Sequence, residues 1–305
     1  MPTPKPFRFG VVAPHLTTRK DLQDFARRAE GDGWSTLLMP DHLGLAASLP
    51  PLVSAADATS TLRVGTVVIN NDFHHPLSLA QELATVDRLT DGRLEIGLGS
   101  GWHKPEYDLL GIAYDKPIVR ARRLNDAWGV MTKAWEGQPT LGFGGRESPA
   151  SPAPLQRPHP PLLVGGHGDT ILRFAAQEAD IVGFTGSTWT RGAMHQTGAS
   201  FEAIAERVAF VRDAAGDRFE QIELHVQVGT VVTDGDVDSA LAEAAARHDT
   251  TPEVILDSPL HMIGSRAAIV DKIRRLREDL GLSYFDFFAW NREALTPVVA
   301  ELAGT

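Results

Sequence analysis

Cysteine is missing from this sequence of 305 residues. Its absence excludes disulfide bonds, thiolate nucleophiles, iron–sulfur clusters and zinc sites with cysteine ligands. The chain also has no run of about 18 apolar residues, the length that a membrane-spanning helix needs. Its first residues, MPTPKPFRFG, lack the apolar core of a signal peptide. We therefore expect a cytoplasmic protein with no membrane partner.

Positive charge is scarce in the chain. Lysine and arginine total 29 residues against 39 aspartates and glutamates, and the formal net charge is −10. No block of basic residues stands out, so the composition argues against a nucleic-acid partner. With 43% hydrophobic residues, a chain of this length can bury a large core. We expect residues 1–305 to form a single α/β domain.

Short β-rich segments alternate along the chain with segments of helical periodicity. The eight β-rich segments are residues 7–13, 35–39, 62–69, 93–99, 162–166, 180–184, 223–232 and 284–290. Helical stripes between them include Leu124, Trp128, Met131 and Trp135, and we expect such stripes to pack in the core. Strands that alternate with helices pair in parallel. Eight such units predict a closed (β/α)8 TIM barrel, with a doubly wound open sheet as the competing fold.

Two segments interrupt this alternation. Residues 137–161 are rich in glycine and proline, and we expect an irregular excursion there before the fifth strand. Residues 185–200 are small and polar and follow the sixth strand. In a barrel this second segment would form a lid over the mouth, or else a mobile surface loop.

Polar residues directly follow most of the predicted strands. In TIM barrels the loops at the carboxyl ends of the strands carry the active site, so these residues should meet at one mouth. The segments that follow the strands are, in chain order, His15, Asp41 with His42, residues 70–76, residues 100–107, residues 165–169, Phe184 with Thr185, and Trp290 with Asn291. Asparagine and aspartate at 70–72 are polar enough to bind a ligand, although they also favour turns.

The segment RLEIGLGSGW, residues 93–102, carries three glycines in alternation. Gly97 and Gly99 match the first two glycines of the dinucleotide-binding fingerprint, but its third glycine position holds Trp102, so a Rossmann site is disfavoured. At a barrel mouth, glycines would let a flat ligand lie close to the backbone. A tight turn from strand to loop is the other interpretation.

Four histidines that follow predicted strands are candidate metal ligands: His15, His42, His74 and His75. No two of them stand in an H-x-H or H-E-x-x-H pattern, and neighbouring side chains on an extended chain point in opposite directions. We expect no metal site, and a metal-dependent hydrolase remains an alternative of another class. Ser100 has Trp102 two residues on, where a nucleophile elbow has glycine, so a serine hydrolase is disfavoured.

The segment LLVGGHGDTILRFAA, residues 162–176, reads as a strand, a glycine-rich turn and a helix. Free backbone N–H groups at a helix start attract anions, and glycines let a phosphate approach the backbone. Gly165, Gly166 and His167 therefore predict a phosphate-binding loop, with a plain tight turn as the other interpretation. Asp169 is expected to cap the helix.

Several longer segments, taken in order, resemble one family. They are FRFGVVAP, ARRAEGDGWSTLLMPDHL, LRVGTVVINNDFHHP, LATVDRLTDGRLEIGLGSGW, and QRPHPPLLVGG followed by EADIVGF. Their order and spacing resemble the bacterial luciferase-like monooxygenase superfamily, and within it the branch that uses coenzyme F420, a deazaflavin. The resemblance implies a (β/α)8 barrel with a flavin-type ring across its mouth.

The resemblance also implies roles for individual residues. It implies a cis peptide bond at Val67–Val68 behind the ring, and it places Asp41 and His42 beside the reacting part of the ring. The other cofactor-binding residues that we expect, from the resemblance and from the polar and glycine-rich strand ends, are Asn71, Gly99, Ser100, Gly101, Gly165, Gly166, His167, Gly183 and Phe184.

Two positions depart from the deazaflavin-dependent sugar-phosphate dehydrogenases that this chain resembles. Ala46 stands where they carry a tryptophan, and Trp102 stands where they carry a glutamate. A sugar-phosphate substrate is therefore not expected. We assign Trp102 and His15 to the substrate side of the mouth, with simple packing as the alternative role of Trp102.

The resemblance predicts an F420-dependent oxidoreductase that transfers a hydride between the deazaflavin and a small or medium organic substrate. The preferred reaction is reduction of an activated C=C bond, in an enone or in a dehydroamino acid of a modified peptide. His42 is the expected proton donor or acceptor, tuned by Asp41, or else a residue that only positions the ring. The alternatives are an FMN-dependent luciferase-like monooxygenase and a cofactor-binding protein without turnover. A homodimer is an expectation from the family.

Overall fold

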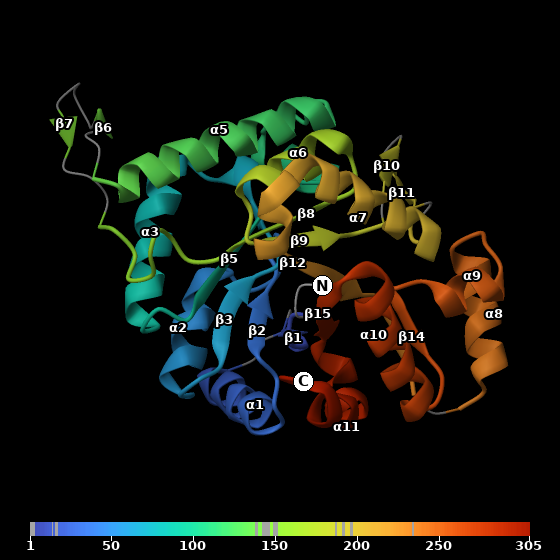
Figure 1. The fold of residues 1–305 in the computed structure, drawn as a ribbon. Coiled ribbons are helices and arrows are strands. Elements are labelled where there is room, and N and C mark those ends of the chain that lie inside the picture. Colours follow the sequence, from blue (N-terminus) through green and yellow to red (C-terminus); the bar gives the residue numbers. More distant parts are fainter. Residues whose placement is uncertain are drawn as a thin grey trace.

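A closed barrel of parallel strands forms the centre of the protein (Figure 1). The computed structural model describes residues 4–13, 15, 18–137, 140–141, 147–148, 152–186, 188–190, 193–195, 198–233 and 235–305. The barrel strands are β1 (Arg8–Val12), β2 (Thr36–Met39), β3 (Arg63–Thr66) with β4 (Ile69–Asn70), β5 (Leu94–Gly99), β8 (Leu162–Gly166), β9 (Ile181–Phe184), β12 (Glu223–Val228) and β15 (Leu282–Phe288). Because β1 pairs with β15 and β3 pairs with β5, the sheet closes on itself. The predicted TIM barrel is confirmed and the open sheet is wrong.

An outer layer of helices covers the barrel (Figure 1). Its members are α1 (Arg19–Gly31), α2 (Leu49–Asp57), α3 (Pro76–Leu89), α5 (Pro117–Trp135), α6 (Asp169–Glu178), α7 (Phe201–Ala215), α10 (Arg266–Leu280) and α11 (Arg292–Leu302). Side-chain caps begin several of them, as where Ser200 and Ser265 accept the N–H groups of Ala203 and Ala268. The predicted stripe of α5, from Leu124 to Trp135, is buried in the core as expected.

Alternate residues of each strand face two different interiors. Strand residues such as Ile96, Val164 and Val182 belong to the large core between the barrel and its helices. The opposite face points into the barrel, where a small cluster of Leu163, Ile181 and Tyr284 supports Val68. Strands buried on both faces explain the nearly continuous apolar runs that the sequence shows.

Charged side chains fill the amino-terminal end of the barrel. Arg8 donates to Glu223 Oε2 at 2.7 Å and also contacts Glu95. Arg63 pairs with Glu95 as well, at 2.5 Å. Burial is the main cause that raises the pKa of Glu223, and the Arg8 guanidinium opposes it. These pairs fill the end of the barrel opposite the predicted mouth.

The seventh predicted strand, residues 223–232, is two strands in the structure. β12 stays in the barrel, whereas β13 (Thr230–Val232) leaves it and pairs in parallel with β14 (His261–Ile263). Helices α8 (Val237–Arg247) and α9 (Pro252–Asp257) pack on this pair and form a second, small hydrophobic cluster. The break falls at Gly229, whose N–H donates to the carbonyl of Leu260 at 2.9 Å.

The two irregular segments are described only in part. Before β8, the short strands β6 (Thr140–Leu141) and β7 (Glu147–Ser148) pair with each other away from the barrel (Figure 1). After β9, strands β10 (Thr188–Thr190) and β11 (Ala193–His195) form an antiparallel pair. Residues 187, 191–192 and 196–197 of the predicted lid lie outside the described residues.

Candidate active site

A cis peptide bond between Val67 and Val68 interrupts the third barrel strand, as the resemblance implied. It separates β3, which pairs with β2, from β4, which pairs only with β5. The neighbouring strand has to make room for this bulge. A Cβ on Gly97 would lie 1.9 Å from the carbonyl oxygen of Thr66, so only glycine fits there. Glycine is therefore required at position 97 by the close approach of the neighbouring strand, whether or not a flat ligand binds there.

The loop after β4 holds a buried polar network. The Tyr107 hydroxyl lies 3.1 Å from Asp72 Oδ2, 3.2 Å from Asn70 Oδ1 and 3.3 Å from the carbonyl oxygen of Ser100. Burial, reinforced by the charge of Asp72, raises the pKa of Tyr107, so its hydroxyl stays protonated and donates. Gly101, at φ +73°, leaves room for this hydroxyl, since a Cβ there would lie 1.9 Å from it.

Arg120 holds the loop that follows β5. This arginine is 3% exposed. It donates to the carbonyl oxygens of Ser100 at 3.0 Å and of Gly101 at 3.1 Å, and its guanidinium stacks 4.1 Å from the centre of the Tyr114 ring. Ser100 and Gly101, both predicted as cofactor contacts, are thus held in one position by a buried cation.

A carboxylate that we did not single out from the sequence contacts His42. The Oε1 atom of Glu106 lies 3.0 Å from His42 Nδ1 and accepts the Leu43 N–H at 2.9 Å. The Glu106 side chain is 8% exposed and that of His42 is 32% exposed. Glu106 comes from α4 (Lys104–Leu110), a helix of seven residues whose proline Pro105 stands in the first turn. In the sequence, the indication of this residue was a glutamate in the segment KPEY, residues 104–107. It lies four residues after Trp102, which replaces the glutamate of related enzymes.

Asp41 has different partners from those we predicted. Its Oδ2 atom accepts the backbone N–H of Asn70 at 3.0 Å and lies 3.3 Å from His74 Nε2. It therefore joins the loop after β2 to the loop after β4. We predicted that Asp41 tunes His42, but the carboxylate hydrogen-bonded to His42 is that of Glu106.

Aromatic side chains line the mouth near His42. The Trp102 ring lies edge-on to those of His42 and His103, with centroid distances of 5.3 and 4.9 Å, and is 39% exposed. At the end of β15, Trp290 stacks on Phe288 at 4.4 Å with the two planes 3° apart. Trp290 is 63% exposed, so one of its faces is open to a ligand.

The glycine-rich loop between β8 and α6 leaves a helix start uncapped. Gly168 is the N-cap residue and no side chain bonds there, so the prediction that Asp169 caps the helix is wrong. Asp169 is instead the first helical residue, and its carboxylate accepts from Arg207 at 2.7 Å. The first N–H groups of α6 are therefore available to an anion.

His167 stands in this loop with a buried ring nitrogen. Its Nδ1 has no hydrogen-bond partner among the described residues. Burial, helped by the charge of Arg207, lowers the pKa of His167, so the ring is neutral at neutral pH. The ring packs against Gly198, where a Cβ would lie 2.1 Å from His167 Cε1.

The remaining predicted residues differ in their positions. Gly165 and Gly183 are paired neighbours on β8 and β9. The Phe184 ring is 1% exposed within the large core, so only its backbone can meet a ligand at the mouth. Asn71 is buried in the turn after β4. His15 is an exposed residue after β1.

The histidines after the strands do not converge. His42 pairs with Glu106, whereas His74 pairs with Asp41. Among the described residues no group of three histidine, aspartate or glutamate side chains is arranged to hold a metal ion. In the same part of the chain, no helix combines the length and the apolar character that crossing a membrane requires.

The profile of the luciferase-like monooxygenase family matches residues 6–277. The chain belongs to this family. The F420-dependent glucose-6-phosphate dehydrogenase of Nakamurella multipartita is 30% identical over 198 residues, which cover 58% of this chain and 56% of that protein. The FMNH(2)-dependent dimethylsulfone monooxygenase of Pseudomonas putida is 27% identical over 205 residues, which cover 65% of this chain and 52% of that protein. The chain thus spans little more than half the length of these two relatives.

A solved structure of another protein shares the fold. The coenzyme F420 dependent tetrahydromethanopterin reductase of Methanopyrus kandleri superposes with a TM-score of 0.74 over 98% of both chains, at 18% identity. The family predicted from the sequence is confirmed, and its members near this chain include proteins named for F420 and for FMN.

The residues at the mouth fit a cofactor with a flat ring and a phosphate. The bulge at Val67–Val68 and the loop at Ser100 and Gly101 offer backbone surface to a ring. The uncapped start of α6 and the unpartnered Nδ1 of His167 offer polar contacts to an anionic group.

Proposed function

We propose that this protein is an F420-dependent oxidoreductase that transfers a hydride between the deazaflavin and a small or medium organic substrate. The observation that carries the proposal is the His42–Glu106 pair at the barrel mouth, where Asp41 also joins the loop after β2 to the loop after β4. The F420-dependent relative at 30% identity supports the choice of cofactor.

Basic residues beside α6 favour F420 over FMN, because F420 has a long anionic tail whereas FMN ends at one phosphate. Arg122 and Arg173 line a pocket of about 220 Å³ between α5 and α6, which extends from Asp169 at the start of α6 to Gln177 near its end. Arg157 is exposed in the segment that precedes β8 and so belongs to the opposite end of the barrel. Arg146 and Arg191 lie outside the described residues.

His42 is the residue that would move a proton in this reaction. With its Nδ1–H donated to Glu106, the neutral ring keeps an acceptor at Nε2, and the protonated ring becomes a donor there. Glu106 holds the ring in one orientation, and Trp102 packs edge-on beside it. The bound deazaflavin would supply or accept the hydride.

The walls of the mouth favour an apolar substrate with a flat group. Trp102 and the Trp290–Phe288 stack present aromatic surface, and the two departures at Ala46 and Trp102 argue against a sugar phosphate. An activated C=C bond in an enone, or in a dehydroamino acid of a modified peptide, remains our preferred target. We propose no nucleic-acid or membrane partner, and a homodimer as the assembly.

Cofactor titration tests the proposal directly. Purified protein is titrated with F420, FMN and NADPH, and binding is followed by cofactor fluorescence. We expect F420 to bind at micromolar concentration and more tightly than FMN. Failure of F420 to bind at that concentration, with FMN bound instead, would overturn it.

A matched variant tests the argument about the tail. Replacing both Arg122 and Arg173 by glutamine should weaken F420 binding about tenfold and leave FMN binding unchanged, since each lost charge contact is worth up to about 1 kcal/mol. Lys116→Gln and Lys133→Gln, which remove exposed charges outside that pocket, serve as controls. Equal weakening for both cofactors would remove the support for F420.

An FMN-dependent monooxygenase is the second candidate, because the dimethylsulfone monooxygenase supports it. A yellow colour after purification, with FMN released on denaturation, would favour it. Elemental analysis separates both candidates from a metal-dependent hydrolase. Turnover of an enone by the F420-loaded protein separates an enzyme from a protein that only binds the cofactor.

A further inference from the structure

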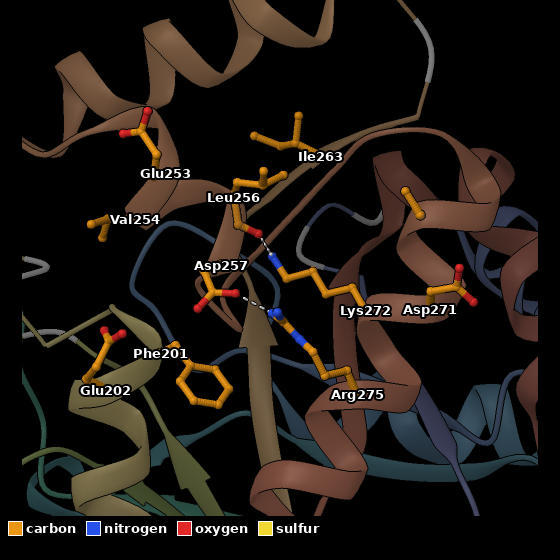
Figure 2. Close-up of a pocket in the computed structure, with 11 residues that line it drawn as sticks. Phe201, Glu202, Glu253, Val254, Leu256, Asp257, Ile263, Asp271, Lys272 and Arg275 are labelled. Atoms are coloured by element: carbon orange, nitrogen blue, oxygen red, sulfur yellow. Dashed lines mark hydrogen bonds and ion pairs between the residues drawn. The ribbon is translucent and has the colours of Figure 1, made fainter.

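A second pocket lies outside the barrel mouth (Figure 2). Its volume is about 640 Å³, and it lies between α7, α9, α10 and β14. Its apolar residues are Phe201, Val254, Leu256, Ile263 and Ala268, and its charged residues are Glu202, Glu253, Asp257, Asp271, Lys272 and Arg275. None of these residues belongs to the candidate active site. The volume suits a small organic ligand.

Lys272 crosses one side of this pocket from α10 to α9 and β14 (Figure 2). Its Nζ donates to the carbonyl oxygen of Leu256 at 2.6 Å and to that of His261 at 2.7 Å. Both acceptors are neutral. In the described part of the chain, no carboxylate oxygen lies within ion-pair distance of this nitrogen, and the nearby Asp257 pairs with Arg275.

The surroundings of Lys272 disfavour the protonated form of its amine. Burial lowers the pKa of Lys272 to about 7; the charge of Arg275 adds to the effect, and that of Asp257 opposes it. A neutral amine has two N–H bonds and one lone pair. Because two carbonyls already accept two hydrogens, loss of the third proton sacrifices neither hydrogen bond and leaves the lone pair without a partner.

We propose that Lys272 is a nucleophilic amine that captures small apolar aldehydes in this pocket as an imine. The lone pair of Nζ attacks the aldehyde carbon, the C–N bond forms, and the C=O π bond breaks to give a carbinolamine. Both amine hydrogens then leave with the aldehyde oxygen as water. The step needs no oxidant or reductant, and hydrolysis reverses it.

The walls of the pocket select the aldehyde. Phe201, Val254 and Leu256 offer an apolar surface to an alkyl or aryl group. The carboxylates of Glu202, Glu253 and Asp271 also line the pocket and disfavour an anionic aldehyde such as glyoxylate. Hexanal is therefore a suitable probe, and glyoxylate its charged counterpart.

The test is reductive trapping at about pH 7 with hexanal and cyanoborohydride, followed by digestion and mass spectrometry of each lysine. We expect Lys272 to be alkylated at least about tenfold faster than the exposed Lys116 and Lys133, because an ordinary lysine is almost fully protonated at this pH. Glyoxylate should modify Lys272 less than hexanal does. Modification of Lys272 no faster than that of the exposed lysines would overturn the proposal.

A pair of variants tests the role of the pocket. Ala268 lines it, whereas the exposed neighbour Ala267 does not. Ala268→Trp should fill the pocket and abolish the preference for Lys272, and Ala267→Trp should preserve it. A preference that survives in Ala268→Trp would contradict capture in this pocket. None of these outcomes depends on the cofactor at the barrel mouth.

Discussion

A buried histidine should make the stability of this protein sensitive to acid. His261 on β14 is 2% exposed, and neither of its ring nitrogens has a hydrogen-bond partner among the described residues. Burial lowers the pKa of His261 from 6.5 to about 4, and the charges of His248, Lys272 and Arg247 contribute to the shift. We predict that His261→Leu, which cannot take up a proton, removes this sensitivity.

The magnitude follows from the two pKa values of His261. Because the folded state has the lower pKa, the unfolded chain binds the proton first as the pH falls, and the folded state loses stability between pH 6.5 and about 4. A difference of about 2.5 pKa units, at about 1.36 kcal/mol each, is a loss of about 3 kcal/mol. Above pH 6.5 this contribution is constant.

Urea unfolding at several pH values between about 7.5 and 4.5 measures the effect. The free energy of unfolding of the wild type should fall relative to His261→Leu by about 2 to 3 kcal/mol over this range. Met262→Leu, on the same strand and fully buried, controls for the change in packing and should keep the wild-type dependence. If the difference between wild type and His261→Leu does not change with pH, the burial of His261 does not exclude the proton.

Three further predictions concern the barrel mouth. Gly97→Ala places a carbon 1.9 Å from a backbone oxygen and should lower the free energy of unfolding by about 3 kcal/mol in urea titrations; a change under 1 kcal/mol would contradict the close approach. Gly101→Ala, at φ +73°, should lower the free energy of unfolding by about 2 kcal/mol or more and should weaken cofactor binding. Urea unfolding and cofactor titration of the same preparation measure the two effects. Glu106→Ala leaves the Leu43 N–H without its acceptor and should lower the free energy of unfolding by about 2 kcal/mol. Glu106→Gln keeps an acceptor, so it should destabilise the protein less but lower kcat of the proposed reaction about 100-fold. Equal kcat for wild type and Glu106→Gln would exclude a role for the charge.

The fold was predictable because its signal is periodic and local. Eight β-rich segments separated by amphipathic helices indicated the barrel, and a barrel strand overlaps each of them. The eighth was placed two residues too late, since β15 begins at Leu282 and ends at Phe288. The seventh predicted strand was too long, because β13 continues the same apolar pattern after Gly229 but pairs with a different strand, β14. A change of partner strand leaves no mark in local periodicity.

The candidate site was predictable where it follows strand ends or matches the family. Asp41, His42, Ser100 and the loop at Gly165 all lie at the carboxyl ends of barrel strands, and the cis bond at Val67–Val68 is present. Glu106 was missed because it approaches His42 across 64 positions of sequence. The cap of α6 was misassigned because aspartate is also common within the first helical turn.

The sequence by itself determined the class of fold, the family and the edge of the barrel where we expect a ligand, because periodicity and strand-end chemistry are local properties of the chain. Only the tertiary structure decided which carboxylate contacts His42, why Gly97 and Gly101 cannot carry side chains, and that Lys272 donates to two carbonyls. Those features depend on distances between segments far apart in the chain, and such distances are set only when the barrel closes.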